Sequence, residues 1–193
     1  MEAAKAVFLR KGLDATKMQD IADEADISRT ALHYYYRTKD ALFKAIFEQA
    51  LNILLPKLNE IIYSDAPFSK KLEVFVEGYT DMLLENPLLP RFILLEMQRN
   101  PENLINIIKS KELEIENIDI FEKQLKEEIA KGNIRNISMA HFFSNLYALC
   151  IFPFLARPIL SVLFFENDEE KVKQFIIERK KIITETILLS LRP

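Results

Sequence analysis

The chain has 193 residues, enough for one or two domains with a hydrophobic core, and its formal net charge of −3 does not by itself indicate a nucleic-acid partner. Nearly half of the residues (49%) are hydrophobic, while only three are glycine and eight are proline, which favours packed helices over a turn-rich sheet protein. Cys150 is the only cysteine, which excludes an intrachain disulfide, and there is no signal-like start or long uncharged apolar run, so we expect a soluble cytoplasmic protein.

The first two helices are predicted from their start and stop signals. Residues 2–11 form an amphipathic stretch, and Gly12 directly after it is typical of a helix C-cap. Thr16, followed by Gln19 three residues later, predicts a capping box at the start of the second helix. Apolar residues at helical spacing then give the second helix one face that can pack.

A third helix is expected after a short break at Asp26 and Ile27. Ser28 is its predicted N-cap, because the serine hydroxyl can accept a hydrogen bond from a free backbone N–H of the first turn. Leu32 and Tyr36 lie on the side that can pack, and Tyr36 is expected in the core. The other arc carries cations, hydroxyls and aromatic groups, namely Arg29, Thr30, His33, Tyr34 and Arg37. A helix with such a face can enter a DNA major groove and hydrogen-bond base edges.

The segment ADISRTALHYYYRTKDALF resembles the recognition segment of the tetracycline-repressor (TetR/AcrR) family of bacterial transcription regulators. The preceding AAKAVFLRKGLDATKMQDIA resembles that family's first two helices. The family pattern is matched at Ala25, Ser28, Leu32, Tyr35, Lys39 and Leu42.

This sequence departs from the family pattern at three places. Asp26 replaces the usual turn glycine, and we expect it to hold a left-handed backbone conformation, which Asp tolerates better than most residues. Lys17 stands where a capping Thr or Ser is common, which leaves Thr16 as the expected cap. Thr30-Ala31 replaces Gly-Thr, which changes the groups that are offered to the bases.

The resemblance implies which residues contact DNA. The expected set is Thr16, Lys17, Ser28, Arg29, Thr30, Ala31, His33, Tyr34, Tyr35 and Lys39. Lys39, just past the helix, can reach a phosphate as a point charge, and His33 is expected to contact a base or a phosphate. For Tyr35, core packing and a phosphate contact through the hydroxyl both stay open. The competing interpretation of the whole face is a solvated surface of an inert helical bundle.

The rest of the chain is also predicted to be helical. Asp40 is expected to cap a fourth helix, which connects two domains over residues 40–63 and continues past Pro56. On this connector, Leu51 and Leu54 are expected to reach the second domain. Further helices are expected at residues 72–85, between Pro101 and Lys131 as one long helix or a broken pair, at 138–152 with a stop near Pro153, at 158–165, and from an Asn167-Asp168 cap to Leu191.

The predicted fold class is all-α with two domains. Residues 1–47 are expected to form a three-helix helix-turn-helix DNA-binding domain, and the resemblance assigns residues 48–193 to an all-α effector-binding and dimerisation domain. Within its apolar stretches, the polar or ionisable candidates for ligand binding are Tyr79, Arg91, Gln98, His141, Asn145 and Tyr147. They line a mostly apolar pocket with a few polar anchors, or they pair with one another or with a partner subunit.

The resemblance also implies partners. The helices around residues 138–152 and 169–191 are expected to form a homodimer interface, and an isologous dimer suits an inverted-repeat site. The implied function is a ligand-responsive transcriptional regulator, a repressor released from a double-stranded DNA operator by a small, largely apolar effector. The alternative is a helical protein-interaction module without sequence-specific DNA binding. A membrane partner is not expected.

An enzyme is not expected. The only histidines are His33 and His141, and neither has the helical spacing of a metal site. Three isolated glycines cannot form a phosphate-binding loop, so neither a metal nor a cofactor is predicted. Cys150 and His141 are poorly spaced for a nucleophile pair, and the apolar setting of Cys150 favours a buried structural thiol.

Overall fold

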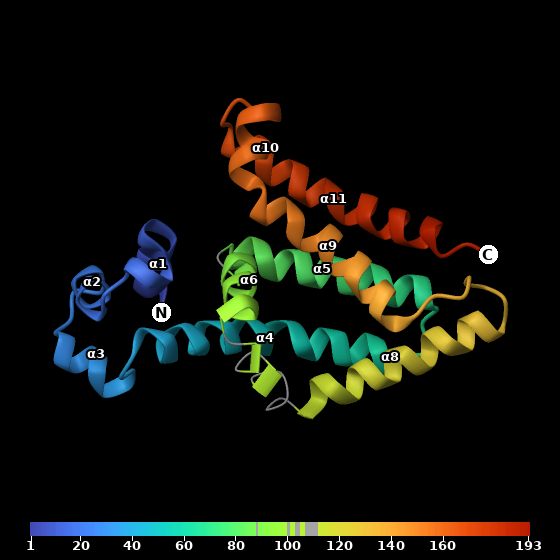
Figure 1. Cartoon of the computed structure of the whole chain (residues 1–193), viewed down its shortest axis with the longest axis horizontal. Coiled ribbons are helices and arrows are strands. Elements are labelled where there is room, and N and C mark those ends of the chain that lie inside the picture. Colours follow the sequence, from blue (N-terminus) through green and yellow to red (C-terminus); the bar gives the residue numbers. More distant parts are fainter. Residues whose placement is uncertain (88, 100, 103–104, 107–111) are drawn as a thin grey trace. The chain divides into compact units, whose positions relative to one another are not determined.

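The structure, a computed structural model, describes residues 1–87, 89–99, 101–102, 105–106 and 112–193. All regular secondary structure in this described part is helical, which confirms the all-α prediction (Figure 1). The helices are α1 (Glu2–Ala15), α2 (Met18–Glu24), α3 (Arg29–Tyr35), α4 (Lys39–Tyr63), α5 (Phe68–Glu85), α6 (Leu89–Arg99), α8 (Glu112–Ala130), α9 (Met139–Leu155), α10 (Arg157–Phe164) and α11 (Glu169–Ser190).

The chain divides into two compact units, Met1–Ile53 and Leu54–Pro193, which are called unit 1 and unit 2 below. The predicted connector corresponds to α4, which continues through Pro56 as expected. The structure does not describe the side chains of Leu51 and Leu54, so their contact with the second domain stays a prediction. The functional boundaries of the two domains also stay predictions.

Unit 1 is held together by a small apolar core that α1, α2, α3 and the start of α4 share. The Phe8 and Phe43 rings meet with their centroids 5.4 Å apart, and Leu32 attaches α3 to this core with 6% of its surface exposed. The other buried apolar residues of unit 1 are Ala4, Val7, Ile21, Ala22, Leu42, Ile46 and Phe47. Gly12 has a φ of 77° and lies at a kink in α1, where a residue with a side chain would be strained.

The turn between α2 and α3 has the predicted geometry. Asp26 has a φ of 52°, so it holds the left-handed conformation that was expected in place of the usual glycine. The Ile27 N–H donates to the Ala22 carbonyl at 3.0 Å, which closes the end of α2. Ser28 then caps α3, because its hydroxyl accepts a hydrogen bond from the Ala31 N–H at 3.0 Å.

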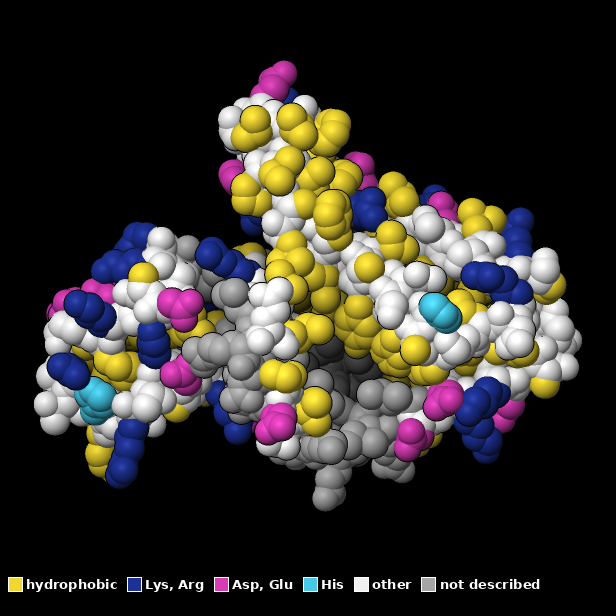
Figure 2. Space-filling view, viewed as in Figure 1, with side chains coloured by type: hydrophobic (Ala, Val, Ile, Leu, Met, Phe, Trp, Pro, Cys, Tyr) yellow, Lys and Arg dark blue, Asp and Glu magenta, His cyan; other side chains and the backbone are white. Residues whose placement is uncertain are grey.

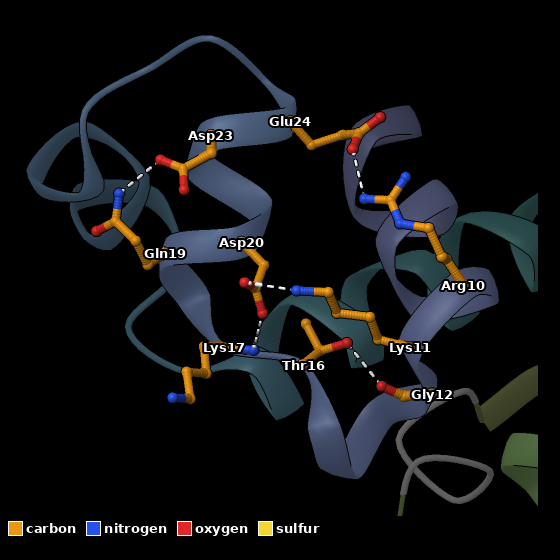
Figure 3. A network of polar contacts seen from close by, with 9 residues as sticks. All are labelled: Arg10, Lys11, Gly12, Thr16, Lys17, Gln19, Asp20, Asp23 and Glu24. Carbon is orange, nitrogen blue, oxygen red and sulfur yellow. Dashed lines mark hydrogen bonds and ion pairs between the residues drawn. The ribbon is translucent and has the colours of Figure 1, made fainter.

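The predicted caps of α2 and α4 are wrong. The N-cap of α2 is Lys17, not Thr16, and the Asp20 carboxylate accepts a hydrogen bond from the Lys17 N–H at 2.8 Å. Thr16 is buried instead, and its hydroxyl donates to the Gly12 carbonyl at 2.6 Å (Figure 3). At α4 the hydroxyl of Thr38, not the carboxylate of Asp40, accepts from the backbone N–H of the first turn, that of Ala41.

Unit 2 is built on α5, α9 and α11, which pack against one another, with α6 against α9 and α8 against α5 (Figure 1). An aromatic cluster of Phe68, Phe121 and Phe142 joins α5, α8 and α9, with centroid distances between 5.1 and 5.9 Å. Other deeply buried residues are Leu72, Val76, Leu83, Leu125, Leu146, Cys150, Val172, Ile176, Ile183 and Ile187. The core of unit 2 therefore lies between these helices.

The later helices differ in detail from the sequence prediction. Helix α9 does not stop at Pro153 but continues to Leu155. Asp168 caps α11 as predicted, since its carboxylate accepts from the N–H groups of Glu170 and Lys171. Whether one helix or a broken pair follows Pro101 falls partly on residues 103–104 and 107–111, which are outside the described part of the chain.

None of the described helices is, on its own, both long and apolar enough to cross a membrane; α9 and α10 pass that test only together, as a pair bent by 65°.

Candidate nucleic-acid interface and effector site

Helix α3 presents the candidate DNA-reading face of unit 1. Its inner side is anchored by Leu32, and Tyr36 is half-buried at the C-cap. On the outer side Arg29 and Thr30 are exposed, and Tyr34 has 83% of its surface exposed. The predicted division of the helix into a packing side and a polar side is therefore present.

Two contacts order the outer face of α3. Arg29 Nε donates to His33 Nε2 at 3.2 Å, which aligns the guanidinium along the helix and leaves its terminal N–H groups for other acceptors. The Tyr34 and Tyr35 rings meet edge to face, with centroids 5.1 Å apart. Tyr35 is 74% exposed, so its hydroxyl is on the surface. The arrangement offers a forked donor and two phenols to an acceptor-rich surface.

A polar network between α1 and α2 sets the position of the helix that precedes α3 (Figure 3). Arg10 pairs with Glu24 at 2.7 Å, and Lys11 pairs with Asp20 at 2.8 Å. The Lys11 ammonium, and after it the Lys17 N–H, hold the pKa of the Asp20 carboxyl below its ordinary value. Because both pairs are on the surface, they orient α2 more than they stabilise the unit.

Three predicted DNA-contact residues lie outside α3, and their roles stay predictions. Lys17 is exposed, as a phosphate contact requires. Thr16 is buried and its hydroxyl is engaged by Gly12. The Lys39 ammonium donates to the carbonyls of Leu13 and Asp14, both at 2.8 Å, so in this structure it binds the C-terminal end of α1. No sequence signal indicated this contact, since the pair is more than twenty residues apart along the chain.

In unit 2, the structure brings together two of the predicted ligand-binding residues. The Tyr79 and Tyr147 rings meet edge to face at 5.3 Å, and two residues that the sequence analysis missed as candidates, Phe75 and Phe143, stack on them. Tyr79 is buried, and this burial raises the pKa of its phenol well above the ordinary value. Each phenylalanine lies four residues before its tyrosine, a helical spacing that could have identified the set.

The other four predicted ligand-binding residues do not join this aromatic cluster. Arg91, Gln98, His141 and Asn145 are exposed. Cys150 is buried as predicted, and burial raises the pKa of its thiol to about 12, which makes it inert. Within the described ranges, no group of three or more His, Cys, Asp or Glu side chains is placed to hold a metal ion.

Comparisons with known proteins agree with this picture. Residues 1–46 match the model of the family described as bacterial regulatory proteins, tetR family. The HTH-type transcriptional regulator YfiR of Bacillus subtilis is 27% identical over 195 residues, covering 97% of this chain and 89% of that protein. The HTH-type transcriptional repressor KstR2 of Rhodococcus jostii is 32% identical over 76 residues, 39% of this chain and 37% of that protein.

Solved structures share the fold over the whole chain. The transcriptional regulator FadR of Bacillus subtilis, in complex with stearoyl-CoA, superimposes with a TM-score of 0.71 at 15% identity, covering 99% of this chain and 97% of that chain. The matched first 46 residues contain α1, α2 and α3 with the exposed face described above. Residues 1–46 therefore form a DNA-binding domain of the tetR family of bacterial regulatory proteins, and the whole chain has the fold of TetR-family transcriptional regulators.

Proposed function

We propose that this regulator is a homodimeric repressor that leaves an inverted-repeat operator when a largely apolar effector binds in unit 2. The observation that carries the proposal is the exposed polar face of α3, on which Arg29, His33 and Tyr34 are presented together. Two such helices, one from each subunit, would enter successive major grooves about 34–36 Å apart, so the protein would read both halves of the operator.

A dimer through α9 and α11 is supported by what these helices leave exposed. On α9, His141, Asn145, Ala148 and Phe152 are exposed at spacings of four, three and four residues, which places them on one stripe. On α11, Ile182 and Leu189 are 49% and 54% exposed. A second copy that covers both stripes would form an isologous interface.

The effector site is proposed around the aromatic cluster of Phe75, Tyr79, Phe143 and Tyr147. These rings offer apolar surface with two phenol groups, the composition expected of a pocket for an apolar ligand with a polar anchor. The fold shared with FadR, solved with stearoyl-CoA, makes a long-chain acyl thioester a suitable first probe. The four exposed candidates would contact such a ligand only where it extends beyond the aromatic rings. They are Arg91, Gln98, His141 and Asn145.

Release would follow from unequal affinity of the effector for two conformations. A ligand shifts such an equilibrium only by the difference between its affinities for the two states. In the proposal, the effector favours the state in which α4 holds the two recognition helices at a separation that does not match the DNA repeat. Phosphate and base contacts of both subunits then cannot form together, and the operator affinity falls.

The experiment is a fluorescence-anisotropy titration of the full-length protein on the DNA upstream of its own gene, with and without stearoyl-CoA. The expected result is sequence-specific binding that weakens when stearoyl-CoA is added and does not weaken with coenzyme A alone. Tyr79→Phe, which keeps the buried ring and removes its hydroxyl, should keep the DNA affinity and weaken the response. Binding that is equally strong on unrelated DNA, or an affinity that rises with an effector, would contradict the repressor proposal.

A further inference from the structure

Helix α10 carries an exposed apolar surface that the regulator function described above does not use. Together with the end of α9, it forms a patch that we call the apolar tip, made of Phe152, Leu155, Ile159, Val162, Leu163 and Phe164. Five of these side chains have more than 60% of their surface exposed. Figure 2 shows hydrophobic side chains gathered on the projecting end of unit 2 that α10 forms.

The tip is oriented with its apolar side outward. Among the residues of α10, Ser161 is buried at 6% exposed, while Leu163 and Phe164 are 66% and 69% exposed. A helix that packs only within its own chain has the opposite arrangement, because burying apolar rather than polar surface is favourable. The outward side of α10 is therefore a surface that a partner would cover.

Local contacts hold the tip in this orientation. The Ser161 carbonyl accepts a hydrogen bond from the Asn167 N–H at 3.0 Å, and the Phe165 ring packs on Phe175 of α11 at 5.1 Å. Arg157, at the start of α10, pairs with Glu169, at the start of α11. The exposed residues cannot be turned inward without breaking these contacts.

We propose that the apolar tip packs against a second copy of this chain and extends the dimer interface beyond α9 and α11. The inference rests on the proposed homodimer. Its support is continuity: Phe152 and Leu155 lie on α9, and they continue the exposed stripe of Asn145 and Ala148 at spacings of three and four residues. The stripe that would face the partner in the dimer thus leads directly into the tip.

The composition of the tip fits a protein partner of the same kind. Residues 158–165 contain no charged side chain, and a buried interface core is depleted in charge and enriched in aromatic residues. In an isologous dimer each copy contributes its own tip, so two apolar surfaces leave water at once. The two tips would then pack against each other and stabilise the dimer.

The test uses the full-length protein with Leu163→Lys, and Leu163→Gln as a milder variant, in sedimentation equilibrium. Because Leu163 is exposed in the subunit, both variants should keep the far-ultraviolet circular dichroism of the wild type. We expect the dimer dissociation constant to rise about tenfold or more, since a charge would be buried in an interface. The matched control is Met97→Lys on α6, 55% exposed and outside the tip, which should leave the constant unchanged.

A second variant separates this inference from the proposed dimer itself. Ile182→Lys on α11 should weaken the dimer whether or not the tip takes part. If Ile182→Lys dissociates the dimer and both Leu163 variants leave the constant as in the wild type, the tip proposal is wrong and the α9–α11 dimer stands. A vesicle flotation assay tests a membrane surface as the other occupant of the tip. If the protein floats with phosphatidylethanolamine–phosphatidylglycerol vesicles, and Leu163→Lys abolishes this flotation without changing the dimer dissociation constant, the tip binds a membrane and the tip proposal is wrong.

Discussion

The two units leave different kinds of surface uncovered. In unit 1, α3 buries Leu32 and exposes Arg29 and Tyr34, so its outer face consists of donors. In unit 2, α10 buries Ser161 and exposes Leu163, so its outer face is apolar. A donor-rich face suits hydrated phosphates and base edges, whereas an apolar face suits another protein surface. The type of partner is therefore indicated by the chemistry of the exposed side chains and not by the extent of their exposure.

The core of unit 2 gives the largest expected effect. Phe142 is 1% exposed and contacts the rings of Phe68 and Phe121, so Phe142→Ala removes a buried ring and leaves a cavity. We expect the free energy of unfolding to fall by about 3–5 kcal/mol in chemical denaturation. Tyr63→Ala, at a 56% exposed aromatic residue, should change it by less than about 0.5 kcal/mol. Equal losses of unfolding free energy in the two variants would mean that the contacts of Phe142 with Phe68 and Phe121 do not stabilise unit 2.

In unit 1, the comparison of Lys39 with Lys17 separates a structural cation from a DNA-facing one. Lys39→Met removes two hydrogen bonds to carbonyls at the end of α1, and we expect the unfolding free energy to fall by about 1.5–3 kcal/mol. Lys17→Met, at an exposed side chain, should leave stability unchanged. It should reduce the slope of log DNA affinity against log salt by about one, the value expected for the loss of one phosphate contact.

The salt slope decides the role of Lys39. If its ammonium remains on the Leu13 and Asp14 carbonyls in the complex, Lys39→Met should keep the wild-type slope of log affinity against log salt. A slope reduced by about one counterion for Lys39→Met would show that the side chain moves to a phosphate on DNA, as the sequence predicted.

The smallest expected effect concerns the α1–α2 network. The pKa of the Asp20 carboxyl is below its ordinary value of 3.8 because of the hydrogen bonds from Lys11 and Lys17. A carboxyl with a lowered folded-state pKa stabilises the fold above its unfolded-state pKa, and this contribution disappears as the pH falls through the folded-state pKa. Asp20→Asn should therefore be slightly less stable than the wild type at pH 7, and the difference should vanish in acid.

Thermal unfolding of both proteins at a series of pH values measures this difference. A constant gap between wild type and Asp20→Asn from neutral to acidic pH would show that the ionised carboxylate is not the stabilising group. Ser28→Ala, which removes the hydroxyl that caps α3 and involves no ionisable group, is the control for a pH-independent change.

Local backbone chemistry was predictable from the sequence, and long-range contacts were not. The left-handed Asp26 and the Ser28 and Asp168 caps depend on neighbours within a few residues, so short-range rules identify them. The predicted cap at Thr16 failed because a lysine N-cap can be completed by its backbone N–H and the Asp20 carboxylate, an arrangement that the usual Ser or Thr signature does not include.

The effector candidates and the apolar tip show the same limit. Tyr79 and Tyr147 meet only because α5 packs against α9, and the sequence of neither helix predicts that the two pack together. The sequence marks residues 158–165 as apolar, but whether that side faces inward depends on how Ser161 and Phe165 are held by α11 and the preceding turn. These features follow from tertiary structure.

The most direct test of the DNA-reading face of α3 is the specificity ratio, the affinity for the DNA upstream of the protein's own gene divided by that for unrelated DNA, for Arg29→Ala and His33→Ala. We predict that this ratio falls by about tenfold or more in Arg29→Ala, less in His33→Ala, and not at all in Arg91→Ala of unit 2. Wild-type ratios in both α3 variants would contradict the account.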